Sequence, residues 1–178
     1  SRIHHGLQDH QAMNMAILQT IEAVSDLSWS KTGALIIFEK YDSLEPIINT
    51  GTVINADVNA ELLKNLFFNK APLHDGAVVL TNGRITAAGC ILPLSANQNI
   101  SKELGTRHRA GLGMSENYDS ISVIVSEETG AISLAQGGML KRHLAPETLE
   151  RLLIQELIPA EEKREKFNVV EWVKGKLK

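Results

Sequence analysis

The stretch "GAVVLTNGRITAAGCILPL" (Gly76–Leu94) holds two apolar runs on either side of the pair Asn82-Gly83. Both residues of such a pair tolerate positive φ, so the stretch predicts a β-hairpin with a tight two-residue turn. A second group of short apolar runs follows in "SISVIVSEETGAISLAQGGMLKRHL" (Ser120–Leu144), with turn signals at "ETG" and at "GG". This stretch predicts three more strands. Antiparallel hairpins therefore make up much of the expected sheet.

Upstream of the first hairpin, the chain alternates helix and strand signals. Residues 6–27 carry apolar side chains at the spacing of one helix face, and "TGALIIFEK" (Thr32–Lys40) is a β-branched run typical of a buried strand. "PIINTGTVIN" (46–55) predicts a short extended segment broken at Gly51. "ADVNAELLKNLFFNKAP" then predicts a helix that begins near Asp57 or Asn59.

Two further helices are expected in the second half. "GTRHRAGLGMSEN" (105–117) predicts a helix with Thr106 as its N-cap, and Pro146 opens another that runs to Leu157. The fold class is therefore α/β (α+β-like), a central mixed β-sheet surrounded by helices in a single domain. We divide the chain into an N-terminal helical extension (1–29), the main domain (30–158) and a charged, amphipathic C-terminal tail (159–178). The apolar face of the extension must pack against the domain's own core or a neighbouring subunit.

Composition limits the class of protein. The 178 residues are 43% hydrophobic with a net charge of −3, which suits one globular domain and gives no general basic field for nucleic acid. Cys90 is the single cysteine, which excludes an intrachain disulfide and is compatible with a reducing compartment. No apolar run reaches the roughly 18 residues of a membrane span, so we expect no membrane segment in this chain and a cytoplasmic location. The chain begins at Ser1 rather than Met, so this expectation does not extend to residues upstream.

Three polar clusters fall at predicted strand ends or helix starts, where loops on a rigid scaffold often carry function. They are His74-Asp75, "GTRHRAG" (105–111) and "SEETG" (126–130). Each also has an ordinary interpretation. Asp-Gly is a common turn pair, and "SEETG" could be only an acidic turn between strands, so the first and third clusters could be turns alone.

The "GTRHRAG" cluster has the requirements of a phosphate site. Gly105 permits close backbone approach, and the N–H groups of Arg107, His108 and Arg109 would be the unpaired donors of a first helical turn. Two arginines are unfavourable beside the positive end of a helix dipole unless an anion binds there. The alternative is an exposed basic turn that forms surface ion pairs, for example with Glu103.

The other two clusters become candidates for a metal site when they are considered together with this phosphate site. A triphosphate needs a divalent metal, and hard carboxylate oxygens with an imidazole suit Mg²⁺, Mn²⁺ or Co²⁺. Carboxylates beside an arginine-rich anion pocket are typical of nucleotidyl or phosphoryl transfer.

The combination of "LHDGAV", "LGTRHRAG" and "IVSEETGAIS", in this order, resembles the diadenylate cyclase domain family. The similarity extends from about Thr32 to Leu157 and also takes in "LPLS" and "ISKELGTRHRA". It implies an enzyme that condenses two ATP molecules into cyclic di-AMP and releases two pyrophosphates. It also implies an α/β domain with a central mixed sheet.

The resemblance assigns roles by motif. Asp75 would help to activate the attacking 3′-hydroxyl, and Gly76 and Ala77 would line the ribose side. Leu92 would lie beside the adenine, whose edge its backbone can read. Residues of the other two motifs would bind the phosphates: Gly105, Thr106, Arg107, His108, Arg109 and Ser126. Of these, Arg107 and Arg109 would also act in catalysis. His74 and Glu128 would bind the divalent metal (Mn²⁺, Mg²⁺ or Co²⁺). Where some relatives carry an aromatic residue, this chain has Ile91, so apolar contact would replace base stacking.

One chain offers one ATP site, whereas a cyclic dinucleotide needs two ATP molecules. We therefore expect a homo-oligomer with face-to-face sites. Two alternatives to a cyclase are a module that senses adenine nucleotides without turnover and a metal-dependent phosphohydrolase. The first would be expected to lack Asp75 or the metal carboxylates, and the second usually needs a denser ligand cluster than His74, Asp75 and Glu128 supply.

Overall fold

The structure is a computed structural model that describes residues 2–160 and 171–176. Its strands form one sheet in the order β2-β4-β3-β1-β5-β6-β7. Their bounds are β1 (Ala34–Glu39), β2 (Thr52–Asp57), β3 (Ala77–Thr81), β4 (Arg84–Cys90), β5 (Ser120–Val125), β6 (Ile132–Gln136) and β7 (Met139–Leu144). β1 and β3 are parallel, and the other neighbouring pairs are antiparallel. The expected mixed sheet is confirmed.

The turn between β3 and β4 has the expected geometry. Asn82 has φ +50° and Gly83 has φ +76°, so both turn residues are in the left-handed region that a two-residue hairpin requires. The three strands expected from Ser120–Leu144 are also present, as β5, β6 and β7.

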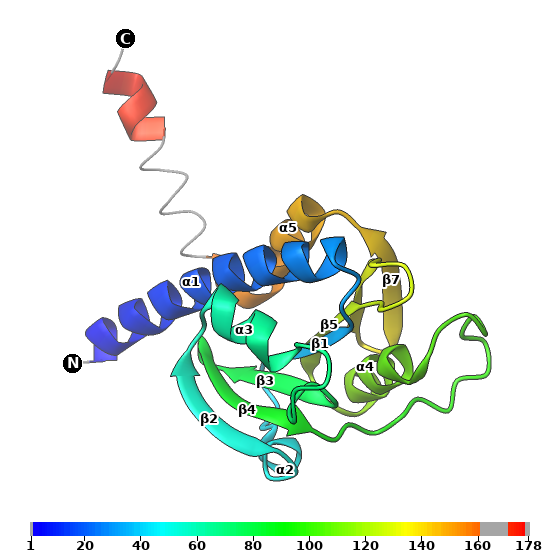
Figure 1. Ribbon diagram of the computed structural model, residues 1–178. Coiled ribbons are helices and arrows are strands. Elements are labelled where there is room, and N and C mark those ends of the chain that lie inside the picture. The colour runs from blue at the N-terminus through cyan, green and yellow to red at the C-terminus, as the bar shows by residue number, and fades with distance from the viewer. Residues whose placement is uncertain (1, 161–170, 177–178) are drawn as a thin grey trace.

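Helices cover both faces of this sheet (Figure 1). They are α1 (Arg2–Trp29), α2 (Glu45–Ile48), α3 (Ala60–Leu66), α4 (Thr106–Asn117) and α5 (Pro146–Leu157). Alternate residues of β1 point to opposite faces, as the period of a strand dictates. Ile36 and Phe38 belong to the apolar cluster shared with α1, α3 and α5, whereas Leu35 and Ile37 belong to the cluster shared with α2 and α4. The central sheet surrounded by helices is thus confirmed.

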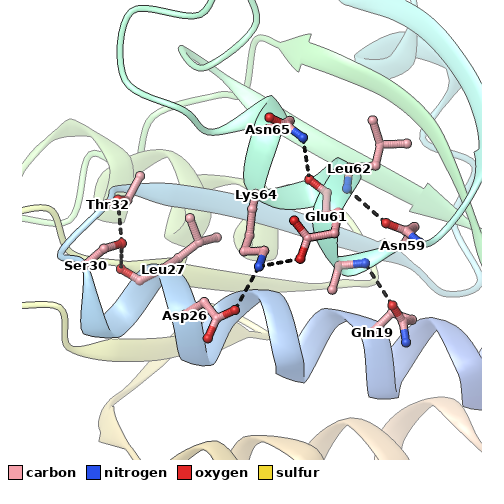
Figure 2. A network of polar contacts seen from close by, with 11 residues as sticks. Gln19, Asp26, Leu27, Ser30, Thr32, Asn59, Glu61, Leu62, Lys64 and Asn65 are labelled. Carbon is pink, nitrogen blue, oxygen red and sulfur yellow. Dashed lines mark hydrogen bonds and ion pairs between the residues drawn. The ribbon is translucent and has the colours of Figure 1, made fainter.

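Helix α1 covers the domain's own core, one of the two partners expected for it. Five of its apolar residues are buried in the same cluster as the sheet: Ala16, Ile17, Ala23, Val24 and Leu27. Polar contacts join it to α3 (Figure 2). Lys64 Nζ lies 2.9 Å from Asp26 Oδ2 and 2.7 Å from Glu61 Oε1, and the Ala60 N–H donates to Gln19 Oε1 at 2.9 Å. The domain boundary at residue 29 stays a prediction.

One expected element differs. Residues 46–48 of the predicted extended segment lie in the short helix α2, and β2 begins only at Thr52, after Gly51. Pro46 is in the first turn of α2, where its missing N–H has no helical partner to lose. The segment is therefore helix and then strand.

The boundaries of the other helices follow their sequence signals more closely. Of the two residues expected at the start of α3, Asn59 is the N-cap, since its side chain accepts a hydrogen bond from the Leu62 N–H at 3.1 Å. α5 begins at Pro146 and ends at Leu157, as expected. Most of the predicted C-terminal tail lies outside the described residues, although 171–176 are helical. Within the described ranges, no helix combines the length and the apolar content needed to cross a membrane.

Candidate functional site

A cavity of about 840 Å³ lies where the start of β3, the end of β4, the first turn of α4 and the turn after β5 meet. Its size is within the range of small-molecule sites. Most of the residues predicted for the site line it: Asp75, Gly76, Leu92, Gly105, Thr106, Arg107, His108, Ser126 and Glu128. The three polar clusters, which are far apart in the sequence, are therefore brought together.

Three predicted residues do not line this cavity. Ala77 is fully buried in β3, within the apolar cluster beneath the site. Arg109 lies between the lining residues His108 and Ala110 but does not itself line the cavity, and its carbonyl accepts a hydrogen bond from the Ser95 N–H at 2.9 Å. His74 is half-buried beside Asp75, and its Nδ1 lies 2.7 Å from the Ala71 carbonyl oxygen. A carbonyl only accepts hydrogen bonds, so Nδ1 is the ring nitrogen that donates here.

Gly76 places Asp75 at the mouth of the cavity. It has φ +97°, and a Cβ at this position would lie 2.7 Å from the Cys90 carbonyl oxygen and 2.9 Å from the Gly89 carbonyl carbon. A glycine is therefore required where the chain enters β3 against the backbone of β4. The exposed Asp75 carboxylate is held directly before this rigid strand.

The first turn of α4 differs from the expectation in one respect. Gly105 is the N-cap, without a side-chain capping bond, and Thr106 is the first helical residue rather than the cap. The Arg109 N–H donates to the Gly105 carbonyl at 3.2 Å, so Arg109 belongs to the helical ladder. The N–H groups that precede the ladder are those of Thr106, Arg107 and His108. The unpaired N–H groups expected at the start of this helix are therefore present, displaced by one residue.

The Arg107 side chain lies between two supports. Its Nη1 is 3.8 Å from Glu127 Oε2, and its guanidinium lies against Gly33, where an added Cβ would be 2.1 Å from Nη1. The side chain is 22% exposed and lines the cavity. The ion pair that forms in the described structure is with Glu127, not with Glu103.

His108 lies deeper than its surface motif suggests. It is only 6% exposed, and burial lowers its pKa, followed by the positive charges of Arg142 and Arg107. The imidazole is therefore neutral at neutral pH and can donate one hydrogen bond and accept one.

The turn after β5 is closed by its own hydrogen bonds. Ser126 Oγ accepts from the N–H groups of Glu128 at 3.2 Å and Thr129 at 3.3 Å. The Gly130 N–H donates to the Ser126 carbonyl at 2.9 Å. This arrangement holds Glu127 and Glu128 at the cavity.

The opposite side of the cavity is apolar. Ile91 and Leu94 are 68% and 58% exposed, and the Ile91 N–H donates to Thr50 Oγ1 at 2.8 Å. Burial raises the pKa of the Cys90 thiol to about 11, so this residue is an inert part of the wall. Lining residues not predicted for the site are Leu35, Gly89, Cys90, Ile91, Leu94, Glu103, Ala110 and Glu127. Of these, Glu127 is within the "SEETG" cluster and Ile91 directly precedes Leu92, the residue expected beside the adenine.

The described side chains alone do not form a complete set of metal ligands. Across residues 2–160 and 171–176, no group of three or more His, Cys, Asp and Glu side chains is close enough to hold an ion. The cavity nevertheless has the carboxylate of Glu128, and His74 lies next to Asp75 at its mouth. Mg²⁺ is often bound by one or two carboxylates together with substrate phosphates and water, and the donors here fit that mode.

The chain is similar to known proteins of one family. Residues 21–140 match the family described as DisA bacterial checkpoint controller nucleotide-binding (DAC). Among curated relatives, the cyclic di-AMP synthase CdaA of Bacillus subtilis is 45% identical over 148 residues, which cover 83% of this chain and 54% of that protein. The diadenylate cyclase CdaS of Bacillus thuringiensis is 48% identical over 118 residues, covering 66% of this chain and 59% of that protein.

A double mutant of DacA from Staphylococcus aureus has a similar crystal structure, with a TM-score of 0.80 and 43% identity. The match covers 82% of this chain and 97% of that one. The chain spans about half the length of the CdaA relative that it matches.

Proposed function

The chain belongs to the DAC nucleotide-binding family, as its motifs indicated, and we propose on this premise that it is the catalytic domain of a diadenylate cyclase. Such a nucleotidyltransferase joins two ATP molecules into cyclic di-AMP and releases two pyrophosphates. The observation that carries the proposal is the meeting of Asp75, Arg107 and Glu128 in one nucleotide-sized cavity. These residues come from the three motifs, and their convergence gives the site its combination of a carboxylate, an anion-binding turn and metal donors.

The first turn of α4 binds the phosphates in this proposal. Free N–H groups and the helix dipole attract an anion, and the Arg107 guanidinium adds a charge-assisted hydrogen bond. Ser126 and the neutral His108 supply further hydrogen bonds without extra charge. The apolar wall at Leu92 and Ile91 takes the adenine.

Asp75 accepts the proton of the 3′-hydroxyl as that oxygen attacks the α-phosphate of the second ATP. Its carboxylate is exposed on the cavity side, where a hydroxyl can reach it. His74 and Glu128 are the proposed metal ligands, and a bound Mn²⁺, Mg²⁺ or Co²⁺ would neutralise phosphate charge and polarise the P–O bond. Nδ1 of His74 donates to the Ala71 carbonyl, so Nε2 is the nitrogen that would bind the metal, the arrangement found in most metal-binding histidines.

The productive species in this proposal is a homo-oligomer in which two cavities face each other. Each ATP supplies a hydroxyl to the other, so the two sites are related by near two-fold symmetry.

Incubation of the protein with ATP and Mn²⁺, followed by chromatography of the products, tests the function. Cyclic di-AMP is the expected product. Unchanged ATP that nevertheless binds would indicate a sensing module, and ADP or AMP would indicate a phosphohydrolase. Either of these outcomes contradicts the proposal.

A further inference from the structure

The connector between α1 and β1 touches both phosphate-side elements of the cavity. We give the name α1–β1 connector to Ser28–Gly33, which are the last two residues of α1 and the four residues that lead to β1. One of its ends contacts the turn that carries Ser126 and Glu128, and the other contacts Arg107. None of its residues lines the cavity, so neither the motifs nor the proposed chemistry includes it.

The first contact joins the end of α1 to the 126–130 turn. Ser28 Oγ donates to the Gly130 carbonyl at 2.6 Å. Gly130 has φ +75°, and a Cβ there would lie 2.3 Å from the Ser28 carbonyl oxygen, so the two backbones are in close contact. Gly130 also donates to the Ser126 carbonyl at 2.9 Å, which extends the link to the cavity.

The second contact is the support of Arg107 by Gly33. An added Cβ at Gly33 would lie 2.1 Å from Arg107 Nη1, 2.4 Å from Cζ and 2.8 Å from Nη2. The whole guanidinium therefore occupies the space that any side chain at position 33 would need. The backbone of Gly33 is outside the positive-φ region, so this glycine is required by the arginine and not by chain geometry.

The connector itself is well fixed. The Lys31 N–H donates to the Ser28 carbonyl at 3.2 Å and the Thr32 N–H to the Leu27 carbonyl at 2.9 Å, which is the hydrogen-bond pattern of a Schellman helix end. Lys31 occupies the left-handed position of this motif with φ +51°. The direction in which the chain leaves α1 is thereby set by hydrogen bonds.

We infer that the α1–β1 connector is a positioning segment for the cyclase site, in which Gly33 seats the Arg107 guanidinium and Ser28 fixes the turn that bears Glu128. The inference rests on the proposed function for its consequence in catalysis. The structural part of this inference is that the residue at position 33 sets the position of the Arg107 guanidinium and thereby affects the phosphate site. A shift of α1 against the sheet would consequently move both elements together.

The test is a mutant cycle between Gly33→Ala and Arg107→Ala. The probe is 3′-deoxy-ATP with Mg²⁺, which lacks the attacking hydroxyl, and calorimetry measures its affinity. Gly33→Ala is expected to weaken binding about tenfold, the loss typical of one hydrogen bond to a charged group. Adding Gly33→Ala to Arg107→Ala should cause no further loss. Thr32→Ala is the matched control, because it changes the same connector without touching Arg107, and its affinity should equal that of the wild type.

Two outcomes overturn the inference. One is wild-type affinity in Gly33→Ala, and the other is a tenfold effect of Gly33→Ala that persists when Arg107 is already alanine. The thermal midpoint should not fall in Gly33→Ala, because the overlapping atoms are the end of a flexible side chain that can turn away and because alanine lowers the entropy of the unfolded chain.

Two measurements without turnover separate this inference from the proposed function. The ¹⁵N signal of the Arg107 Nε–H group, recorded without nucleotide, should shift in Gly33→Ala, and an unchanged signal contradicts the seating of the guanidinium. Ser28→Ala should speed hydrogen exchange at the Gly130 amide, and equal exchange contradicts the link from α1 to the turn. If the wild-type protein makes no cyclic di-AMP, the proposed function is refuted. The two measurements above would still show whether the connector positions Arg107 and the 126–130 turn.

Discussion

Gly76→Ala should destabilise the protein more than Gly137→Ala, and the structure allows the two causes to be separated. The first cause is backbone conformation, because Gly76 has φ +97° and an L-residue with positive φ costs about 1–2 kcal/mol. The second is overlap, because the new Cβ would lie 2.7 Å from the Cys90 carbonyl oxygen. The overlapping atoms are backbone atoms at the end of β4 and cannot turn away.

Gly137→Ala is the matched control. Gly137 also has positive φ, +57°, but an added Cβ there has no neighbour within 4 Å. It should therefore show the conformational cost alone, about 1–2 kcal/mol. Gly76→Ala should add the cost of forcing atoms into a packed region, about 1–3 kcal/mol, for a total of about 2–5 kcal/mol.

Urea unfolding of the two variants and the wild type measures the difference. Product formation should also fall in Gly76→Ala, because relief of the overlap moves the start of β3 and with it Asp75. Equal unfolding free energies for the two variants would refute the reasoning that backbone contact with β4 makes Gly76 necessary.

Three further predictions concern charged residues. Asp75→Asn keeps the size of the side chain but removes the proton acceptor, so synthesis of cyclic di-AMP measured by chromatography should fall about 10²–10⁴-fold while 3′-deoxy-ATP still binds. Arg107→Ala should weaken ATP binding at least about tenfold in calorimetry. Arg109→Ala should weaken ATP binding less than Arg107→Ala does, because Arg107 lines the cavity and Arg109 does not. Equal losses of affinity would contradict this placement. The hydrogen bond from Gln136 is the main cause that lowers the pKa of Glu156. A lowered folded-state pKa gives stability that is present above the unfolded value of 4.5 and lost as pH falls through the folded pKa. The free energy of unfolding should accordingly fall less steeply with acid in Glu156→Gln, and parallel curves would show that the carboxylate has no such role.

Local signals were sufficient for the elements whose ends depend on a single side chain. Pro146 can begin a helix because its missing N–H is unpaired there, and Asn59 can cap one with its own oxygen. The pair Asn82-Gly83 likewise determines its turn. In contrast, the short helix α2 depends on Leu44 and Ile47 being buried under the sheet, which is a tertiary effect that no local pattern records.

The candidate site was predictable where polar residues break an apolar pattern, as they do at Asp75 and in the first turn of α4. The sequence could not distinguish Leu35 or Cys90 in the cavity wall from other core residues, because both look like ordinary strand positions. The burial of His108 could not be predicted either, since it depends on how α4 packs against the sheet. The need for a glycine at position 33 is the clearest case of a feature that the sequence could not predict. It comes from the side chain of Arg107, which is 74 positions later in the sequence.

Activity should depend on protein concentration, because the proposed reaction needs two cavities. One chain supplies one Asp75 and one phosphate-binding turn, and each ATP must present its 3′-hydroxyl to the α-phosphate of the other. Holding both nucleotides in line gives much of the rate advantage of such a reaction, so an isolated subunit loses it even when its own ATP is bound. The rate per subunit should therefore rise across a dilution series as the face-to-face contact forms, with light scattering recording the mass of the species present. Asp75→Asn mixed in excess with the wild type should lower the rate per wild-type subunit, because mixed pairs cannot complete both bonds. Full activity from a strictly monomeric species would contradict the paired site and with it much of the case for cyclisation.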